Sequence, residues 1–403
     1  MEIVEIGTLP PLGVVPEYMY AQVIRQSRYG LPQDAYKIEK IKIPELKDNE
    51  VLVAVMAAGL NFNSIWAGRG YPIDMIQLIQ LRKDSTDDFQ IAGSDCSGIV
   101  YKIGSKVKNV KVGDEVVMQA GWYDEEDPWV KNGGDIELAP SVRAWGYETS
   151  WGTFAQFCLA KYFQCLPKPK HLSWEKAAVY MLSGATSYRM LYKYDPHVVK
   201  KGDVVLIWGG AGGLGTMAIQ LVLLAGGIPV AVVNTEEKRK YCEGMGALVI
   251  DRTQFDCWGA MTSEMLTPER QKEWQGKSKL FLKKILEITG GKLPRIVFEH
   301  SGEQTMAVSL FVCDKDGMVV TCAGTTGYLG TFDIRYLWLL RKRIQGSHFA
   351  DVEECIEFNN LITEGKINPV LASTVSFEEL PNALQIMYEN KHKGNTAIKV
   401  GYK

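Results

Sequence analysis

The sequence has no long apolar stretch, no paired cysteine motif and almost no net charge. No apolar run approaches the roughly 20 residues that cross a bilayer, and the first residues show no signal-peptide pattern. Its eight cysteines are scattered singly, which excludes a disulfide framework and favours reduced thiols. A net charge of −2 offers no basic surface for nucleic acid or membranes. We therefore expect a cytoplasmic protein with small-molecule partners.

Hydrophobic residues, in contrast, make up 46% of the 403 residues, enough for the cores of about two domains. Short β patterns separated by Gly and Pro fill residues 1–182 and are typical of a barrel-like β domain. Strand and helix patterns alternate over 183–339, which predicts a doubly wound parallel sheet. A polar stretch near 253–279 interrupts this alternation and is expected to form a surface insertion. Residues 340–403 are expected to complete the first domain.

The most informative motif is a glycine-rich turn between an expected strand, 203–208, and an apolar helical stretch, 217–224. We expect it to bind a dinucleotide through Gly210, Gly212, Gly213, Leu214 and Gly215. In such a site the first glycine permits a tight turn, the second lets the backbone approach a pyrophosphate, and the third lets helix and strand pack closely. A glycine-rich turn without a ligand is the alternative, but the position between strand and helix favours dinucleotide binding.

The residues after the next expected strand, 228–233, indicate which dinucleotide is bound. An NAD site usually has Asp or Glu at this strand end, to bind the ribose 2′-hydroxyl. Here the strand ends in Asn234 and Thr235, and Lys238 follows. Small polar groups with a lysine suit a 2′-phosphate, so the sequence predicts NADPH as the cofactor. The alternative is a solvated helix start whose acidic residues, Glu236 and Glu237, complement the helix dipole.

The order of these parts resembles the medium-chain dehydrogenase/reductase superfamily. The resemblance implies a catalytic GroES-like β barrel, a Rossmann domain that binds NADP, and a C-terminal return to the barrel. Zinc-dependent members carry Gly-His-Glu in the first domain and a lobe of four cysteines. Here residues 93–98 read GSDCSG and the lobe is missing, so we expect no metal. The chain is similar to the zinc-free branch, which includes quinone reductases and enoyl-thioester reductases.

Short stretches narrow the resemblance to crotonyl-CoA carboxylase/reductases. They are NFNSIW at 61–66, RAWGYET at 143–149, VFEH at 297–300, RYLW at 335–338 and GSHFA at 346–350. In that family an Asn, an aromatic–Glu pair and a His form a small CO2 pocket beside the nicotinamide. The matching catalytic positions are Asn63, Tyr147, Glu148 and His348. Arg335 and Tyr336 match a family pair near the acyl-CoA substrate.

The resemblance implies hydride transfer from NADPH to the β-carbon of a short-chain α,β-unsaturated acyl-CoA, such as crotonyl-CoA or acrylyl-CoA. Capture of CO2 at the α-carbon then gives an alkylmalonyl-CoA. Asn63 would donate a hydrogen bond to CO2, while Glu148 and His348 would hold a water that donates a second. Hydride transfer leaves an enolate of the thioester, and Tyr147, where the family commonly has Phe, would shield this enolate from bulk water.

Other functions fit the same fold. They are an enoyl-CoA reductase that only protonates its product, a quinone or alkenal oxidoreductase, and a nucleotide-sensing protein without catalysis. The residues have simpler explanations as well: Asn63 as a turn residue, Glu148 as a local cap and His348 as a core histidine. Members of the superfamily are usually dimers or tetramers. We expect a homodimer or homotetramer, in which the apolar strand 317–322 extends the sheet across a two-fold axis.

Overall fold

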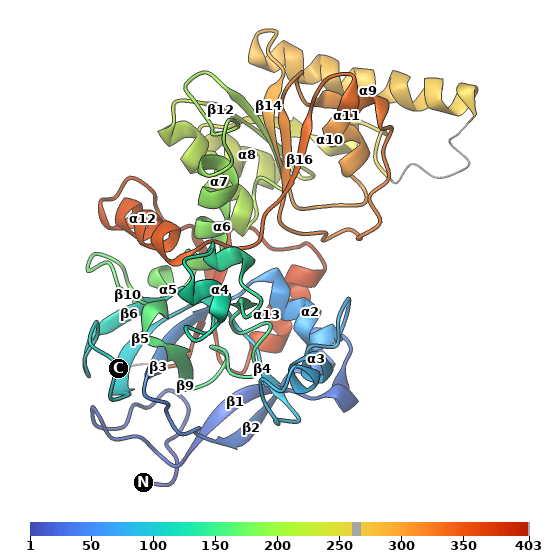
Figure 1. Cartoon of the computed structure of the whole chain (residues 1–403). Helices are drawn as coiled ribbons and strands as arrows, with labels where there is room; N and C mark the ends of the chain where they lie inside the picture. The colour runs from blue at the N-terminus through green and yellow to red at the C-terminus, as the bar shows by residue number, and fades with distance from the viewer. Residues whose placement is uncertain (260–266, 402–403) are drawn as a thin grey trace. The chain divides into compact units, whose positions relative to one another are not determined.

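The computed structural model describes residues 1–259 and 267–401 (Figure 1). They form two compact units, one of residues 1–185 with 349–403 and one of residues 186–348. The sequence predicted boundaries slightly earlier, at 182/183 and 339/340. The second boundary falls later because β16 (Arg343–Gly346) still pairs with β15 (Met318–Thr321) in the sheet of the second unit.

The first unit is built on a seven-stranded sheet in the order β10-β6-β5-β3-β18-β17, with β9 also paired to β3. The central strand β3 (Glu50–Gly59) is buried along its whole length and is antiparallel to its partners β5 (Cys96–Ile103), β9 (Phe157–Lys161) and β18 (Asn395–Lys399). Its apolar sequence, VLVAVMAAG after Glu50, is what a strand covered on both faces requires. Through β18 the C-terminal segment thus becomes part of the first unit's sheet.

Smaller elements complete this unit. The other strands are β1 (Tyr18–Ile24), β2 (Lys37–Lys42), β4 (Gln90–Ile91), β6 (Glu115–Met118), β7 (Gly121–Trp122), β8 (Arg143–Ala144), β10 (Cys165–Pro167) and β17 (Leu371–Ser376). The helices are α1 (Pro32–Ala35), α2 (Phe62–Arg69), α3 (Met75–Leu81), α4 (Pro128–Lys131), α5 (Trp174–Ala177), α12 (Val352–Thr363) and α13 (Leu380–Tyr388). The boundary at 185/186 falls within α6 (Met181–Tyr192).

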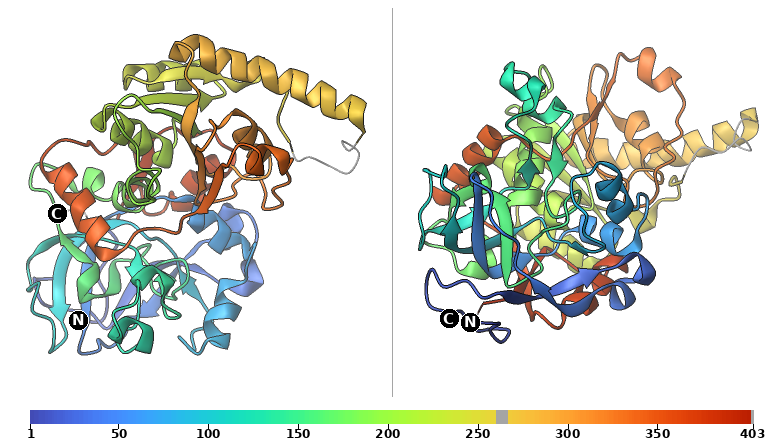
Figure 2. Two further views of the ribbon diagram at one scale, coloured as in Figure 1. Left: turned by 45° about the horizontal axis from the view of Figure 1, so that its top comes forward. Right: turned by 60° about the horizontal axis from the view of Figure 1, so that its bottom comes forward.

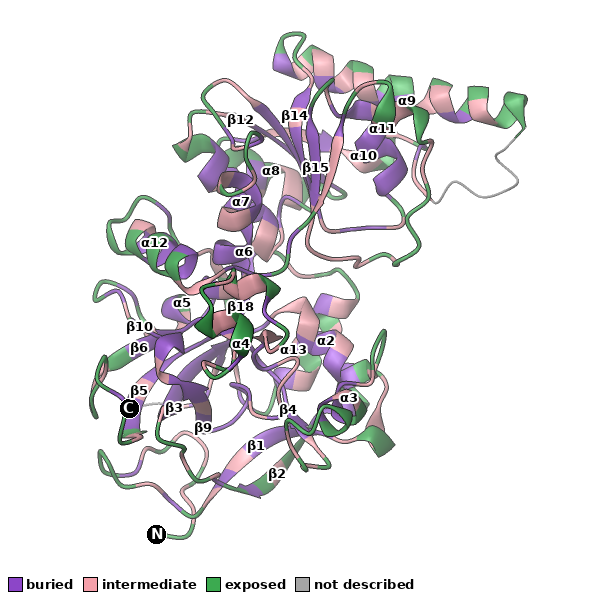
Figure 3. Cartoon of the chain, viewed as in Figure 1, coloured by how far each residue is buried: buried purple, intermediate pink, exposed green. Residues whose placement is uncertain are grey.

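The second unit contains a six-stranded, fully parallel sheet in the order β13-β12-β11-β14-β15-β16. Its further strands are β11 (Val204–Trp208), β12 (Ile228–Val233), β13 (Leu248–Asp251) and β14 (Pro294–Glu299). Its helices are α7 (Gly213–Leu224), α8 (Glu236–Gly244), α9 (Pro268–Thr289), α10 (Met306–Val312) and α11 (Arg335–Trp338). Strands β12, β14 and β15 are largely buried (Figure 3). The predicted parallel doubly wound sheet, combined with a β-rich domain, is confirmed.

The order of the parallel sheet corrects one prediction. Strand 317–322 was expected at the edge, but β15 lies between β14 and β16. The apolar sequence of β15 reflects burial in the sheet interior, whereas the more polar β16, RIQG, forms the edge. A sheet extension across a two-fold axis therefore has to use β16 or β13.

The polar stretch 253–279 also differs from the expected insertion. Residues 260–266 lie outside the described residues, and 268–279 form the first half of α9, which Figure 2 shows as one continuous helix. Its buried residues, Trp274, Ser278, Phe281, Ile285 and Thr289, follow at helical spacing and form one stripe. Much of the polar stretch is therefore the exposed side of an amphipathic helix. Over the described ranges, no helix combines the length and apolar character needed to cross a membrane.

Candidate active site

The glycine-rich turn connects β11 to α7. Gly209 has a φ of +56°, in the left-handed region that favours glycine, and its carbonyl accepts a hydrogen bond from the Gly212 N–H at 2.9 Å. A Cβ on Gly210 would lie 2.5 Å from the Ala231 Cβ, and one on Gly215 would lie 2.4 Å from the Gly209 oxygen. This hydrogen bond closes a turn whose central residues are Gly210 and Ala211, and the left-handed residue, Gly209, stands just before them. Gly210 and Gly215 are needed for close packing of loop, strand and helix.

Gly212 differs because the chain's own packing does not require a glycine there. A Cβ on Gly212 would meet only the Gly209 oxygen, at the ordinary contact distance of 3.4 Å. Gly212 is the N-cap of α7, whose first residues are Gly213 and Leu214. The first N–H groups of a helix have no acceptor within the helix and carry partial positive charge. Open space over Gly212 beside this helix start fits a pyrophosphate group, so the residues present fit a dinucleotide.

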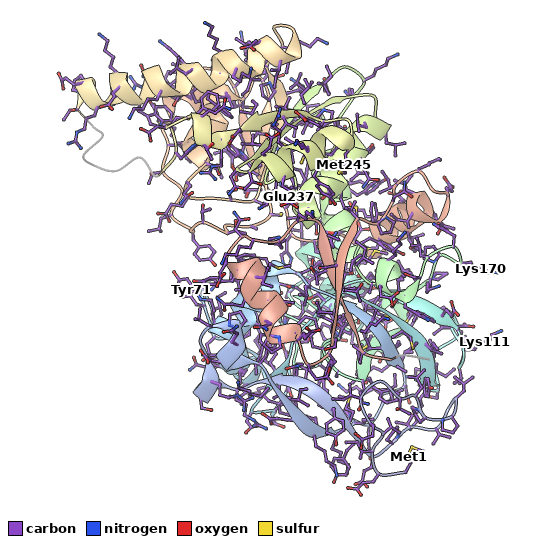
Figure 4. The ribbon with its side chains drawn as sticks, turned by 180° about the vertical axis from the view of Figure 1, so that it is seen from behind. Met1, Tyr71, Lys111, Lys170, Glu237 and Met245 are labelled. Carbon is purple, nitrogen blue, oxygen red and sulfur yellow. The ribbon has the colours of Figure 1, made fainter. Side chains whose placement is uncertain are left out.

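Of the three residues predicted to bind the 2′-phosphate of NADPH, two contact each other. Thr235 caps α8, and its Oγ1 accepts a hydrogen bond from the Lys238 N–H at 3.2 Å. Asn234, also exposed, is the first residue after β12, so the strand end carries no carboxylate. Figure 4 locates Glu237, the neighbour of Lys238, on the first turn of α8.

Lys238 differs from the two cations that follow it. Arg239 forms ion pairs with Glu236 at 2.7 Å and Glu243 at 3.0 Å, and Lys240 lies 3.8 Å from Glu236. Lys238 is half-buried, and burial lowers its pKa although the charge of Glu237 opposes this shift. The ammonium of Lys238 is partly desolvated, so an anionic ligand beside it would stabilise its charge.

Asn63 lies on the first turn of α2. The helix begins after Asn61, whose extended backbone (φ −135°, ψ 156°) forms the N-cap. The Asn63 Nδ2 donates a hydrogen bond to the Ser94 Oγ at 2.9 Å, and Ser94 is fully buried. The neighbouring Asn61 Nδ2 donates to the Asp95 Oδ2 at 3.2 Å. Both asparagines are therefore tied to the segment between β4 and β5.

Tyr147 and Glu148 lie in a turn that packs against the same segment. Gly146 has a φ of +73°, and a Cβ there would come within 1.8 Å of the Gly93 oxygen, so only glycine allows this approach. The ring of Tyr147 lies 6.2 Å from that of Trp66 on α2, one turn after Asn63. The structure therefore brings α2 and the turn 144–149 together.

The carboxylate of Glu148 has two partners. Its Oε2 accepts a hydrogen bond from the Ala144 N–H at 2.8 Å, and its Oε1 lies 3.5 Å from the guanidinium of Arg82, just after α3. The predicted local cap is thus present, but an ion pair from another element also fixes the carboxylate.

His348 belongs to the second unit, two residues after β16, and is exposed. This exposure excludes the core-histidine alternative. Asn63, Tyr147 and Glu148 all belong to the first unit.

Arg335 and Tyr336 are held by contacts within the second unit. Arg335 pairs with Asp333 at 2.6 Å and donates to Gln271 of α9 at 3.3 Å. The Tyr336 hydroxyl accepts a hydrogen bond from the Gln275 Nε2 at 2.9 Å. Helix α9, which includes part of the expected insertion, thus positions both predicted substrate residues.

Comparisons with known proteins fit this geometry. Residues 47–170 match the family model described as alcohol dehydrogenase GroES-like domain, and residues 213–364 match zinc-binding dehydrogenase. A crotonyl-CoA carboxylase/reductase of Cereibacter sphaeroides is 46% identical over 402 residues, covering 99% of this chain and 91% of the relative. The chain belongs to the crotonyl-CoA carboxylase/reductase family.

Other relatives of the crotonyl-CoA carboxylase/reductase family show the same pattern. A crotonyl-CoA reductase of Streptomyces collinus is 39% identical, covering 91% of this chain and 82% of the relative. The solved structure of the crotonyl-CoA carboxylase/reductase AntE in complex with NADP has a TM-score of 0.93 at 46% identity, with 99% of this chain and 98% of that chain covered. The 2-octenoyl-CoA carboxylase reductase CinF, solved with NADP and 2-octenoyl-CoA, has a TM-score of 0.88 at 35% identity, covering 96% and 89%.

The residues present do not fit zinc, in spite of the name of one family model. Across residues 1–259 and 267–401, no group of three or more His, Cys, Asp or Glu side chains is arranged to hold a metal ion. Asp95 stands where zinc-dependent relatives have Glu. Its carboxylate accepts hydrogen bonds from the Asn61 Nδ2 at 3.2 Å and the Leu182 N–H at 3.1 Å. The segment therefore holds asparagine side chains and a helix start in place of a metal.

Sequence reasoning missed three residues that shape this site. Gly209 was left outside the glycine motif, although it carries the left-handed conformation. Ser94 was noted only as a replacement for histidine, and Arg82 was not noted at all. Ser94 and Arg82 contact partners far away in the sequence, and no local pattern reveals such contacts.

Proposed function

We propose that this NADPH-dependent enoyl-CoA reductase carboxylates its substrate. It reduces a short-chain α,β-unsaturated acyl-CoA, crotonyl-CoA or acrylyl-CoA, and adds CO2 to give an alkylmalonyl-CoA. The cofactor and the reductase activity accord with the family and with the NADP-bound relatives. The observation that best supports carboxylation is the packing of α2, which bears Asn63, against the turn that bears Tyr147 and Glu148.

NADPH, when bound, supplies the hydride that reduces the β-carbon of the thioester. The chain's own residues then determine what the α-carbon of the resulting enolate meets. CO2 is uncharged and its oxygens are weak acceptors, so a neutral amide donor suits it. Asn63 has two N–H bonds on Nδ2, and the hydrogen bond to Ser94 uses one of them. We assign the second to CO2.

Glu148 is suited to hold a water for the same substrate. Arg82 and the Ala144 N–H fix the orientation of the carboxylate, and an ionised carboxylate has about four acceptor sites. We assign His348 as the second group that binds this water, which would then donate to CO2.

Tyr147 favours a second candidate function, an enoyl-CoA reductase that only protonates. Its ring, packed beside Trp66, would exclude water from the enolate. Its hydroxyl, absent from the Phe that the family commonly has, would donate a proton to the enolate. Carboxylation and protonation therefore compete at this residue.

The remaining predicted residues would bind the cofactor and the acyl-CoA. Lys238 would pair with the 2′-phosphate of NADPH. Arg335 and Tyr336 would contact the acyl-CoA, and a CoA phosphate at Arg335 would have to replace Asp333 as its partner.

We further propose that the protein forms a homodimer or homotetramer through an edge of the parallel sheet. We also propose that it works in the reducing cytoplasm, which suits its eight unpaired cysteines.

The test combines the enzyme with NADPH, crotonyl-CoA, labelled bicarbonate and carbonic anhydrase, followed by analysis of the acyl-CoA products. We expect a substantial share of ethylmalonyl-CoA. Asn63→Leu should shift the product toward butyryl-CoA by about fivefold, the equivalent of about 1 kcal/mol for one neutral hydrogen bond, while NADPH oxidation continues. Tyr147→Phe should shift it in the opposite direction. If butyryl-CoA is the sole product at high CO2, the carboxylase function is refuted and the enzyme is a reductase that only protonates its product.

A further inference from the structure

The segment that replaces the zinc motif holds both asparagines at the start of α2. Ser94 binds Asn63, and Asp95 binds Asn61, as described above. Ser94 and Asp95 are 0% and 1% exposed, so water does not compete for these contacts. A buried serine could serve only to satisfy local polar groups, but here its partner is the amide assigned to CO2.

The backbone of this segment is fixed on both sides. The Asp95 carbonyl accepts hydrogen bonds from the Gly59 N–H at 2.9 Å and the Thr153 Oγ1 at 3.2 Å. A Cβ on Gly93 would lie 2.3 Å from the Thr153 Oγ1, which shows how tightly the chain packs there. Ser94 therefore presents its hydroxyl from a rigid support.

A rigid partner matters because the last torsion of an asparagine side chain is broad. An amide without a partner can turn about this torsion, and its N–H bonds then point in many directions. A hydrogen bond from Nδ2 to Ser94 restricts the torsion, and the direction of the second N–H is then fixed as well. Such preorganisation is most useful for a ligand that accepts hydrogen bonds weakly, because that ligand cannot orient the amide itself.

We propose that Ser94 is a positioning residue for CO2 capture, which it serves by orienting the side-chain amide of Asn63. This inference rests on the proposed carboxylase function and assigns Ser94 no contact with substrate. It gives the Ser-Asp segment a function in the reaction where zinc-dependent relatives use the same place for metal.

The test measures two quantities in each variant: the rate of NADPH oxidation, and the ratio of ethylmalonyl-CoA to butyryl-CoA at subsaturating CO2. Ser94→Ala should lower the ratio about fivefold, as expected for one neutral hydrogen bond, and leave NADPH oxidation within about twofold. Ser94→Cys, which keeps the volume but accepts hydrogen bonds weakly, should change the ratio in the same direction. Ser94→Thr should retain most of the wild-type ratio.

Two further variants separate this role from a general effect on the fold. Ser97→Ala is the matched control, because Ser97, the second residue of β5, is an equally buried serine whose hydroxyl donates to the Trp174 carbonyl. It should keep the wild-type ratio. The double variant Asn63→Leu, Ser94→Ala should match Asn63→Leu alone, because Ser94 acts through Asn63.

Several results would overturn the inference. An unchanged ratio in Ser94→Ala, or independent effects in the double variant, would show that Ser94 does not act through Asn63. Equal loss of oxidation and carboxylation in both Ser94→Ala and Ser94→Cys would assign Ser94 a purely structural role. If wild type and Ser94→Ala carboxylate equally well, this inference is refuted and the proposed carboxylase function is retained. A wild-type enzyme that forms no ethylmalonyl-CoA would refute the proposed function and the inference with it.

Discussion

At the scale of single residues, the proposed pairing of Lys238 with the 2′-phosphate predicts which substitution changes the preference between NADPH and NADH. Lys238→Ala should raise the KM for NADPH about tenfold or more, since a hydrogen bond to a charged group contributes about 1.5–3 kcal/mol. The KM for NADH should hardly change, because NADH lacks the 2′-phosphate. Steady-state kinetics with both cofactors measure the effect. Arg239→Ala is the matched control, since the guanidinium of Arg239 is engaged by Glu236 and Glu243. Equal effects of the two substitutions on NADPH would contradict the assignment.

Asp95 gives the protein a predictable dependence on pH. Burial raises the pKa of its carboxyl to about 7, and hydrogen bonds from Leu182 and Asn61 oppose this only in part. The unfolded chain releases the same proton near pH 4, at about 3.9. The folded state thus binds the proton more tightly, and its stabilising effect, complete below pH 4, is lost as the pH rises to about 7. The slope is at most about 1.4 kcal/mol per pH unit.

Asp95→Asn should remove this dependence, because an amide does not titrate. Thermal unfolding at pH 5 and pH 8 should show that wild type loses several degrees relative to Asp95→Asn at the higher pH. Asp88→Asn is the control, since the side chain of Asp88 is 78% exposed. An equal change in unfolding temperature between pH 5 and pH 8 for wild type and Asp95→Asn would refute the assignment of this pH dependence to Asp95.

The identity of candidate residues was easier to predict than their partners. Asn63, Tyr147, Glu148 and His348 were found through the resemblance of short motifs, and their roles stay predictions. Nothing in the sequence near Asn63 indicates that Ser94 accepts its hydrogen bond. Such contacts depend on how strands and turns far apart in the chain are brought together.

At the scale of elements, strand and helix types followed from local patterns, but positions within the sheet did not. Both β15 and β16 could be edge strands when judged by sequence alone. The order of the sheet is set by packing of the whole unit, and it places the apolar β15 inside. At α9 the polar composition led to a wrong prediction, because the exposed side of one long helix was interpreted as an insertion. Amphipathic spacing, from Trp274 to Thr289, was the available signal.

The glycine turn shows the same limit on a smaller scale. The motif correctly indicated a turn between β11 and α7. It did not indicate that the left-handed residue is Gly209, because several adjacent glycines permit the same conformation. Only the packing of the loop against Ala231 and His300 distinguishes them.

At the scale of the whole molecule, we expect activity to be independent of metal, because the cysteine side chains of both units are poorly suited to bind zinc. Zinc binds thiolates and neutral imidazoles. Seven of the eight cysteines are buried, and burial raises the pKa of Cys242, Cys257 and Cys313 to about 12. These thiols stay protonated near neutral pH and are poor ligands.

Prolonged treatment with a chelator, followed by its removal, should therefore leave NADPH oxidation with crotonyl-CoA unchanged. A zinc-dependent alcohol dehydrogenase treated in parallel should lose activity and regain it with added zinc. The same response from this protein would contradict its placement in the zinc-free branch, and it would also require new partners for Ser94 and Asp95. Ser94 and Asp95 accept hydrogen bonds from Asn63 and Asn61, so a metal bound by Ser94 and Asp95 would have to break the contacts that hold the start of α2. Full activity after chelation is thus the result expected if this segment orients side chains instead of binding metal.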